Sequence, residues 1–211
     1  MATYRTRLRF RLLKKLSIKE PEHRFHIAGH EVVLSATVPE LAIEESKWLI
    51  MNARDFATQS DATDFGHRLR TALELSSVAT RLGVDAGCDL PTSSIAESLK
   101  NEISKKTGAL VRDNVHGVDV FQDNPNVSIF GISAKCNWNG AQEPGSVPAL
   151  LDELVKAPAT CSVEAKDVIL LLNYALMRPE PVAQILFAVS AVEMLGRTRR
   201  GQPTRRRCLK T

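Results

Sequence analysis

The stretch Tyr4-Arg5-Thr6-Arg7-Leu8-Arg9-Phe10-Arg11-Leu12 alternates at every step between an uncharged side chain and an arginine. Successive side chains of a β-strand point to opposite faces of the sheet, so this period of two predicts a strand. The uncharged residues would face a core, and the four arginines would form a wet, basic side. The chain therefore begins with a half-buried strand, and a sheet must exist to receive it.

Outward from this strand, the first half of the chain reads as a mixture of strands and helices. Further strands are expected within residues 25–38, with a break at Gly29, and within 45–53. The pattern Thr58-x-x-Asp61 is typical of a helix start, and the helix is expected to end near Leu82. A shorter helix from Ser93 or Ser94 would bury Ile95, Leu99 and Ile103, and the segments 117–122 and 127–134 would form a hairpin.

After residue 137 the composition favours helices only. Residues 137–145 contain glycines and a proline and read as a linker, followed by helices over 147–156, 163–177 and 181 to about 195. The expected divisions are an α+β domain (1–136), a linker (137–146), a helical segment (147–196) and a basic, disordered tail (197–211). The fold class is α+β: a mixed or antiparallel sheet with two helices, then a short C-terminal helical bundle segment.

The last two helices are apolar on more than one side, and little chain remains to cover them. Such helices need partners around most of their circumference. We therefore expect an exposed apolar surface there, which would serve a homo-oligomer or a protein partner.

Charge and cysteine usage exclude several classes of protein. Seven of the 28 basic residues, and no acidic ones, lie in the last sixteen positions; without them 21 basic residues face 24 acidic ones. The net charge of +4 therefore does not by itself indicate a nucleic-acid partner. The four cysteines are far apart and form no paired motif, so we expect no metal site and no cofactor. No apolar run is long enough to span a membrane, and the expected location is cytoplasmic.

Two groups of arginines are candidate nucleic-acid contacts. Arginines on alternate strand positions could follow a phosphate backbone; the alternative is that they pair with acidic residues such as Glu31, Glu44 and Glu45 on neighbouring strands. The tail could act as a basic arm, or it could be a plain tail without a function. These candidates are Arg5, Arg7, Arg9, Arg11, Arg205, Arg206 and Arg207.

Three polar residues are candidates for catalysis. Asp113 and His116 lie where a loop enters a strand, which is a common position for catalytic groups. Glu193 lies within an apolar helix, where a buried carboxylate would have a raised pKa. The alternatives are a hydrogen-bonded turn for His116 and a helix rim position for Glu193. An enzyme would bring at least two of the three into one cleft.

The segment 178–196, with Ala183-Gln184-Ile185-Leu186-Phe187-Ala188-Val189-Ser190-Ala191-Val192-Glu193-Met194-Leu195, resembles a helix of bacterial HEPN-type proteins, especially the Apea-like group. Residues 163–177 resemble the preceding helix of that bundle, and 61–85 resemble part of an α+β region that precedes it. The resemblance implies a helical bundle used in RNA cleavage or nucleotide binding, often in defence or toxin–antitoxin systems. Active members carry an arginine followed by a histidine late in the bundle, and no histidine follows His116 here.

The preferred hypothesis is a non-catalytic interaction or regulatory module related to HEPN-type proteins. The alternative hypothesis is an RNA-binding protein or ribonuclease of a bacterial defence or toxin–antitoxin system. Whether the chain is an enzyme stays open at this point, with the absent histidine favouring a negative answer.

Overall fold

The computed structural model describes residues 3–91, 96–124, 127–130, 141–142, 146–156, 161–178 and 180–200. Its helices are α1 (Gln59–Thr80), α2 (Glu97–Thr107), α3 (Ser146–Lys156), α4 (Val163–Met177) and α5 (Pro181–Arg200), with a 3-10 turn η1 (Ile43–Glu45). Its strands are β1 (Tyr4–Leu12), β2 (Lys15–Leu16), β3 (Glu22–Ile27), β4 (His30–Ala36), β5 (Trp48–Phe56), β6 (Val84–Asp85), β7 (Leu90–Pro91), β8 (Leu110–Asp113), β9 (Val115–Gln122), β10 (Val127–Phe130) and β11 (Ala141–Gln142). The α+β fold class is confirmed.

The main sheet is antiparallel and is built around β1. Its strand order is β3-β4-β5-β1-β9-β7, and β6 pairs with the end of β1. β1 lies between β5 and β9, with Leu8 opposite Met51 on one side and Val118 on the other. The alternating sequence at the start of the chain therefore forms a central strand, which explains why its uncharged face is so apolar.

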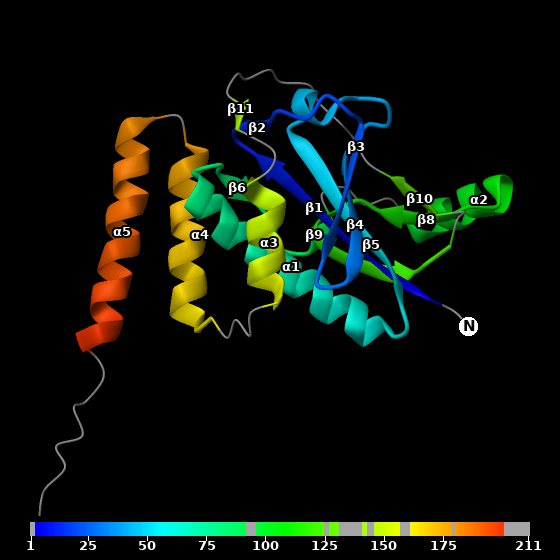
Figure 1. The fold of residues 1–211 in the computed structure, drawn as a ribbon. Coiled ribbons are helices and arrows are strands. Elements are labelled where there is room, and N and C mark those ends of the chain that lie inside the picture. The colour runs from blue at the N-terminus through cyan, green and yellow to red at the C-terminus, as the bar shows by residue number, and fades with distance from the viewer. Residues whose placement is uncertain are drawn as a thin grey trace, which may run out of the picture.

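Helices cover one face of this sheet in successive layers (Figure 1). α1 packs on β1, β5 and β9; α3 packs on α1 and β3; α4 packs on α1 and β6; and α5 packs chiefly on α4. α3 is also tied to the sheet because the Asp152 carboxylate accepts a hydrogen bond of 2.9 Å from the Ala28 backbone N–H. α2, β8 and β10 lie together at the opposite side of the molecule from α5 (Figure 1).

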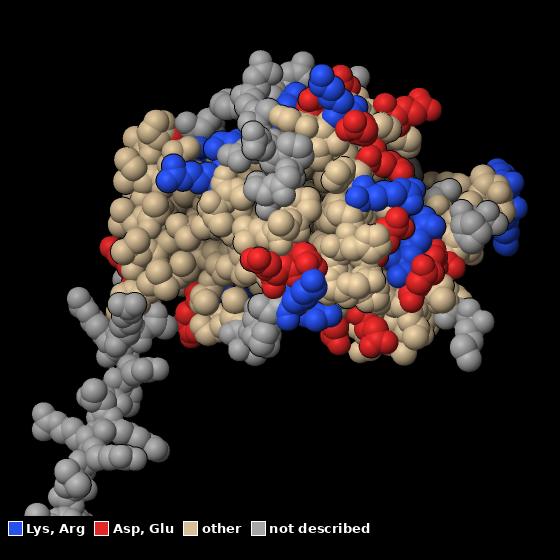
Figure 2. Space-filling model, viewed as in Figure 1, with Lys and Arg blue, Asp and Glu red and all other residues tan. Residues whose placement is uncertain are grey.

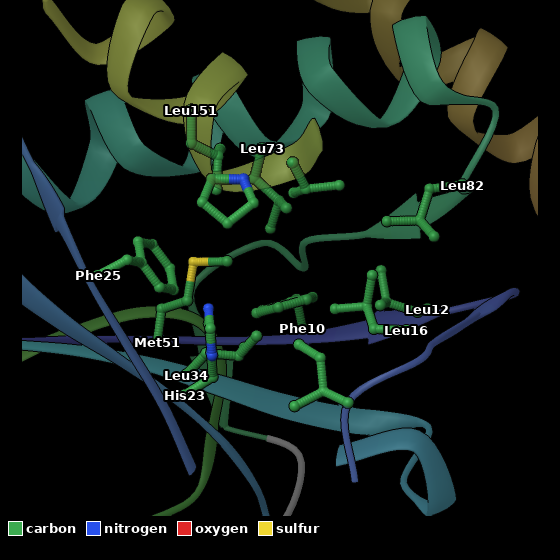
Figure 3. Close-up of a pocket in the computed structure, with 13 residues that line it drawn as sticks. Phe10, Leu12, Leu16, His23, Phe25, Leu34, Met51, Leu73, Leu82 and Leu151 are labelled. Atoms are coloured by element: carbon green, nitrogen blue, oxygen red, sulfur yellow. The ribbon is translucent and has the colours of Figure 1, made fainter. Parts of the chain in front are cut away.

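The core lies between the sheet, α1 and α3 (Figure 3). It is formed by aliphatic residues and phenylalanines, among them Leu8, Phe10, Met51, Leu69 and Leu151, all 1% exposed or less. A cavity of about 10 Å³ remains between these layers. That volume is at the lower limit for a single water molecule, so the cavity is a packing defect and cannot hold a ligand.

Several local predictions are confirmed. Thr58 caps α1 through a hydrogen bond of 3.1 Å from the Asp61 N–H, and Ser162 caps α4 through the Ala165 N–H. Gly108 ends α2. The helix from Gln59 was expected to end near Leu82, and it ends at Thr80 with Arg81 in the left-handed conformation as its C-cap.

Other predictions were wrong. β10 does not form a hairpin with β9. It pairs in parallel with β8, for which the sequence had predicted no strand. Leu99 is 45% exposed, and the buried residue of α2 is Lys100, so the expected apolar stripe of that helix does not face the core. Ser93, Ser94 and Ile95 lie outside the described residues.

The expected division of the chain at 137–146 also falls mostly outside the described residues. Within it, β11 (Ala141–Gln142) pairs in parallel with β2 near the start of the chain. The helix that follows, α3, shares the core of the sheet region, since Val147, Leu151 and Val155 belong to the same cluster of buried residues.

Candidate functional site

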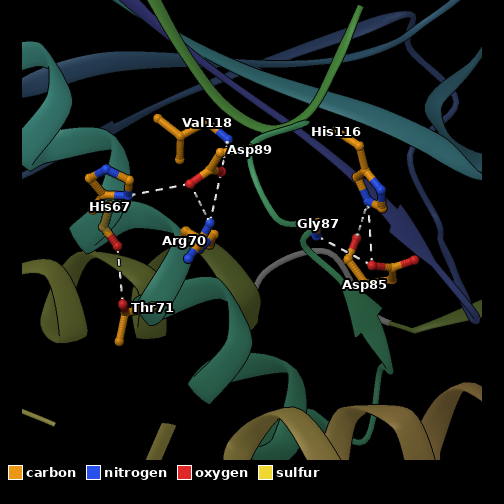
Figure 4. Close-up of polar contacts among 8 residues, drawn as sticks. All are labelled: His67, Arg70, Thr71, Asp85, Gly87, Asp89, His116 and Val118. Carbon is orange, nitrogen blue, oxygen red and sulfur yellow. Dashed lines mark hydrogen bonds and ion pairs between the residues drawn. The ribbon is translucent and has the colours of Figure 1, made fainter. Parts of the chain in front are cut away.

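His116 lies near the start of β9 and contacts β6 (Figure 4). Its ring Nε2 is 3.0 Å from the backbone oxygen of Asp85 and 3.4 Å from Asp85 Oδ1, and its ring packs edge-on against Trp48. A carbonyl oxygen can only accept a hydrogen bond, so Nε2 carries the proton. His116 therefore joins two strands, which matches the hydrogen-bonded alternative considered for it.

Asp113 lies at the end of β8 and binds Lys100 of α2. Lys100 Nζ is 2.6 Å from Asp113 Oδ2 and 2.7 Å from Glu97 Oε1. The hydrogen bonds to Asp113 and then Glu97 raise the pKa of Lys100 above its ordinary value. This charged cluster holds α2 on β8.

Glu193 is exposed on α5, and thus lies at the rim of that helix rather than in its packed face. α5 is on the opposite side of the molecule from β8 (Figure 1). The three catalytic candidates are therefore found in three different settings: a strand junction, a helix support and an exposed helix surface.

A polar contact that the sequence analysis missed centres on Asp89 (Figure 4). Its carboxylate accepts bonds of 2.7 and 2.8 Å from Arg70 Nη1 and a bond of 2.7 Å from the Val118 N–H. His67 Nδ1 lies 4.0 Å from Asp89 Oδ2. Asp89 thus ties the loop between β6 and β7 to both α1 and β9. Its partners are 19 and 29 residues away, so no local motif marks them.

The middle of the arginine face of β1 is buried and only Arg11 at its end is exposed, which corrects the prediction of a wet face from the alternating pattern. Arg7 and Arg9 are 4% and 5% exposed. Arg5 pairs with Asp123, Arg7 donates a bond of 3.1 Å to Asn114 Oδ1, and Arg11 pairs with Asp85. None of these partners is one of the glutamates that the sequence analysis considered.

Aromatic rings on the neighbouring strands cover part of this face. The Arg9 guanidinium lies 3.8 Å from the centre of the Trp48 ring, and that of Arg5 lies 5.4 Å from the Phe121 ring. Guanidinium groups pack favourably on aromatic faces. The sequence of β1 alone does not show these rings, because they come from β5 and β9.

Burial and charge repulsion leave Arg7 in a costly setting. Burial, together with the charge of Arg9, lowers the pKa of Arg7 to about 10. Asp119 is also buried, and it accepts a bond of 2.7 Å from Arg112. Each of the four β1 arginines thus has a partner within the fold. Arg205, Arg206 and Arg207 lie outside the described residues.

A hollow of about 750 Å³ lies at the N-terminal end of α1. It is open to solvent and lined by His30, Asp55, Phe56, Ala57, Asp61, Asp64, Phe65, His67 and Arg68. Asp61 already takes part in the cap of α1. Within the described part of the chain, no group of three or more His, Cys, Asp and Glu side chains is arranged to hold a metal ion.

Among the described elements, α5 carries more exposed large apolar residues than any other. The inner side of this helix packs on α4, where Ala191 is 1% exposed and the Phe187 ring lies 6.1 Å from that of Tyr174. The opposite side carries five exposed aliphatic residues, which we call the outer face of α5: Val182 (70% exposed), Ile185 (61%), Leu186 (63%), Val189 (50%) and Val192 (67%). In Figure 2, the side of the molecule formed by α4 and α5 shows few charged side chains. This confirms the expected exposed apolar surface.

One buried amide fixes α4, and through it α5, on the body of the fold. Asn173 is 1% exposed, and its Oδ1 accepts bonds from Ser77 Oγ (2.7 Å) and the Val84 N–H (3.3 Å). Its Nδ2 donates to the backbone oxygens of Glu74 and Ile169. Because every polar atom of this side chain is used, α4 has one favoured position against α1 and β6.

Nothing outside the structure places this surface within a known group of proteins. None of the described helices combines the length and the apolar character needed to cross a lipid bilayer. Comparisons with protein-family models, with curated proteins and with solved structures gave no match to this chain.

Proposed function

We propose that this chain is a non-catalytic protein-interaction module, related to HEPN-type proteins, that docks an apolar helix against the outer face of α5. The observation that carries the proposal is five neighbouring aliphatic residues, each at least half exposed, on one side of a single helix. Scattered apolar residues are normal on protein surfaces, but a continuous apolar patch marks an interaction site.

The packing of α4 supports the same proposal. A helix that displays a binding surface must be held rigidly, since a mobile support would add an ordering cost to every binding event. Asn173 and the aromatic contact between Tyr174 and Phe187 provide this support. Asp113 and His116, in contrast, are engaged in contacts between elements of the fold.

A synthetic amphipathic helix is a suitable probe because the natural partner is not identified. We would titrate the chain into a fluorescently labelled peptide whose leucines follow a three- and four-residue spacing, and follow its anisotropy. Ile185→Glu should weaken binding by at least about tenfold, because it places a charge at the centre of the contact. Leu99→Glu is the matched control, since it adds the same charge to another exposed leucine, on α2, and should leave binding unchanged.

The proposal fails if the peptide does not bind at millimolar chain concentrations. It fails equally if Ile185→Glu and Leu99→Glu bind the peptide as well as the unchanged chain does.

A further inference from the structure

Glu193 lies on the same side of α5 as the outer face. It follows Val182, Leu186 and Val189 after eleven, seven and four residues. At 3.6 residues per turn, each of these steps returns a side chain to within about 40° of the same direction. The helix therefore carries a lengthwise row of three exposed aliphatic side chains that ends in an exposed carboxylate.

The surroundings of Glu193 leave room for a side chain of a partner. Within the described part of the chain, its carboxylate takes part in no hydrogen bond or ion pair. Gly196 lies three residues further along, and nothing stands within 4 Å of the position that its Cβ would occupy. The carboxylate is thus bordered by Val189 on one side and by bare helix backbone on the other, where another chain can approach closely.

We infer that the helix that docks on the outer face of α5 carries a lysine or arginine at one end of its apolar stripe, which pairs with Glu193. The inference rests on the proposed function and states the chemistry of the partner. An apolar surface laid over Glu193 would take its carboxylate out of water, which is costly for an unpaired charge. A basic side chain offsets this cost, and its aliphatic stem packs on the apolar row at the same time.

The same carboxylate disfavours two other occupants of this face. A second copy of the chain, paired by a two-fold axis through the same row, would meet Glu193 with the aliphatic end of that row or with its own Glu193. A helix with a purely apolar stripe would leave the carboxylate unpaired at the contact. Because Glu193 stands at one end of the row, a basic partner residue also fixes the direction in which the helix docks.

The expected effect is moderate, because Glu193 lies at the end of the contact and stays close to water. Exposed ion pairs contribute little, so a lysine opposite Glu193 should strengthen binding about two- to fivefold over a neutral residue. The gain should shrink as the salt concentration rises, because salt screens charges at the surface.

Three versions of the fluorescently labelled amphipathic peptide test the pair. They carry lysine, glutamine or glutamate at one end of the leucine row. A helix can dock in either direction, so this end can reach Glu193. The unchanged chain should bind the lysine peptide most tightly and the glutamate peptide least tightly.

Exchanging the charge on the chain should reverse this order. Glu193→Lys should bind the glutamate peptide most tightly, and Glu193→Gln should bind the lysine and glutamine peptides equally. Glu102→Lys is the matched control, because it makes the same change at an exposed position on α2, on the opposite side of the molecule (Figure 1). It should keep the order seen with the unchanged chain.

The possible failures are separable. If all three peptides bound equally, or if the preference for lysine survived in Glu193→Lys, the inference would be overturned and the proposed function would stand. Failure of all three peptides to bind would refute the proposed function, and this inference with it. A mass that rose from 23.3 kDa towards twice that value with concentration, but not in Ile185→Glu, would identify a second copy as the occupant and would also overturn the inference.

Discussion

Replacing Asn173 with alanine should be among the most damaging single changes in the helical layers. The side chain is buried and makes four hydrogen bonds, two as acceptor and two as donor. Its removal would leave the Ser77 hydroxyl and the Val84 N–H without their acceptor in a buried setting. An orphaned buried polar group costs about 1–3 kcal/mol, so we expect a loss of about 3–4 kcal/mol in the free energy of unfolding.

Thermal and urea unfolding followed by circular dichroism would measure this effect. For a chain of this length, a loss of 3–4 kcal/mol corresponds to a fall of about 6–16 °C in the midpoint temperature. Ser162→Ala is the matched control in the same helix, since it removes an exposed cap and should cost about 1 kcal/mol. If Asn173→Ala cost no more than Ser162→Ala, the argument that Asn173 fixes α4 would be refuted.

Three further predictions follow from other contacts. Burial raises the pKa of Glu74, so the folded state binds its proton more tightly than the unfolded state does. The folded state therefore loses stability as the pH rises through the folded pKa. Glu74→Gln should raise the melting temperature at pH 7 and leave it almost unchanged at pH 4. Asp119→Asn should lower the free energy of unfolding by about 2 kcal/mol or more, because it removes a buried carboxylate beside Arg7. Adding Arg7→Met to this variant should recover part of the loss in a double-mutant cycle. Additive losses would contradict this account. Gly117→Ala should destabilise the fold far more than Gly29→Ala in urea titrations. Both glycines have positive φ, but only at Gly117 would a Cβ collide with Asp89. Equal losses in the free energy of unfolding would show that the collision is relieved without cost.

The elements that the sequence predicted well are those with a regular period or a local signal. The strand Tyr4–Leu12 and the helix Val163–Met177 match their expected bounds, because alternation in one and the Ser162 cap in the other are written in adjacent residues. The buried residues of α1 between Ala62 and Ser76 also follow the three- and four-residue steps of a helix in the sequence, although Ala79 is exposed. Periodicity works where one side of an element faces a continuous core.

The predictions that failed depended on contacts between distant segments. Whether Arg7 and Arg9 face water cannot be read from β1 alone, since Trp48 and the residues of β9 that cover them come from elsewhere in the chain. The pairing of β10 with β8 involves only four residues of each strand, and β8 carries no clear alternation. The candidate surface on α5, in contrast, was predictable, because apolar residues occupy more than one side of that helix in the sequence.

The layered order of the helices has a mechanical consequence. Since α5 is held mainly by α4, and α4 by Asn173 and its contacts with α1 and β6, a pulling force applied at residue 200 would reach the sheet last. An optical-trap experiment should therefore record a small, low-force extension as α5 peels away, before the cooperative rupture of the rest. α5, which carries the exposed apolar face, would detach first, and the sheet would stay folded at that force.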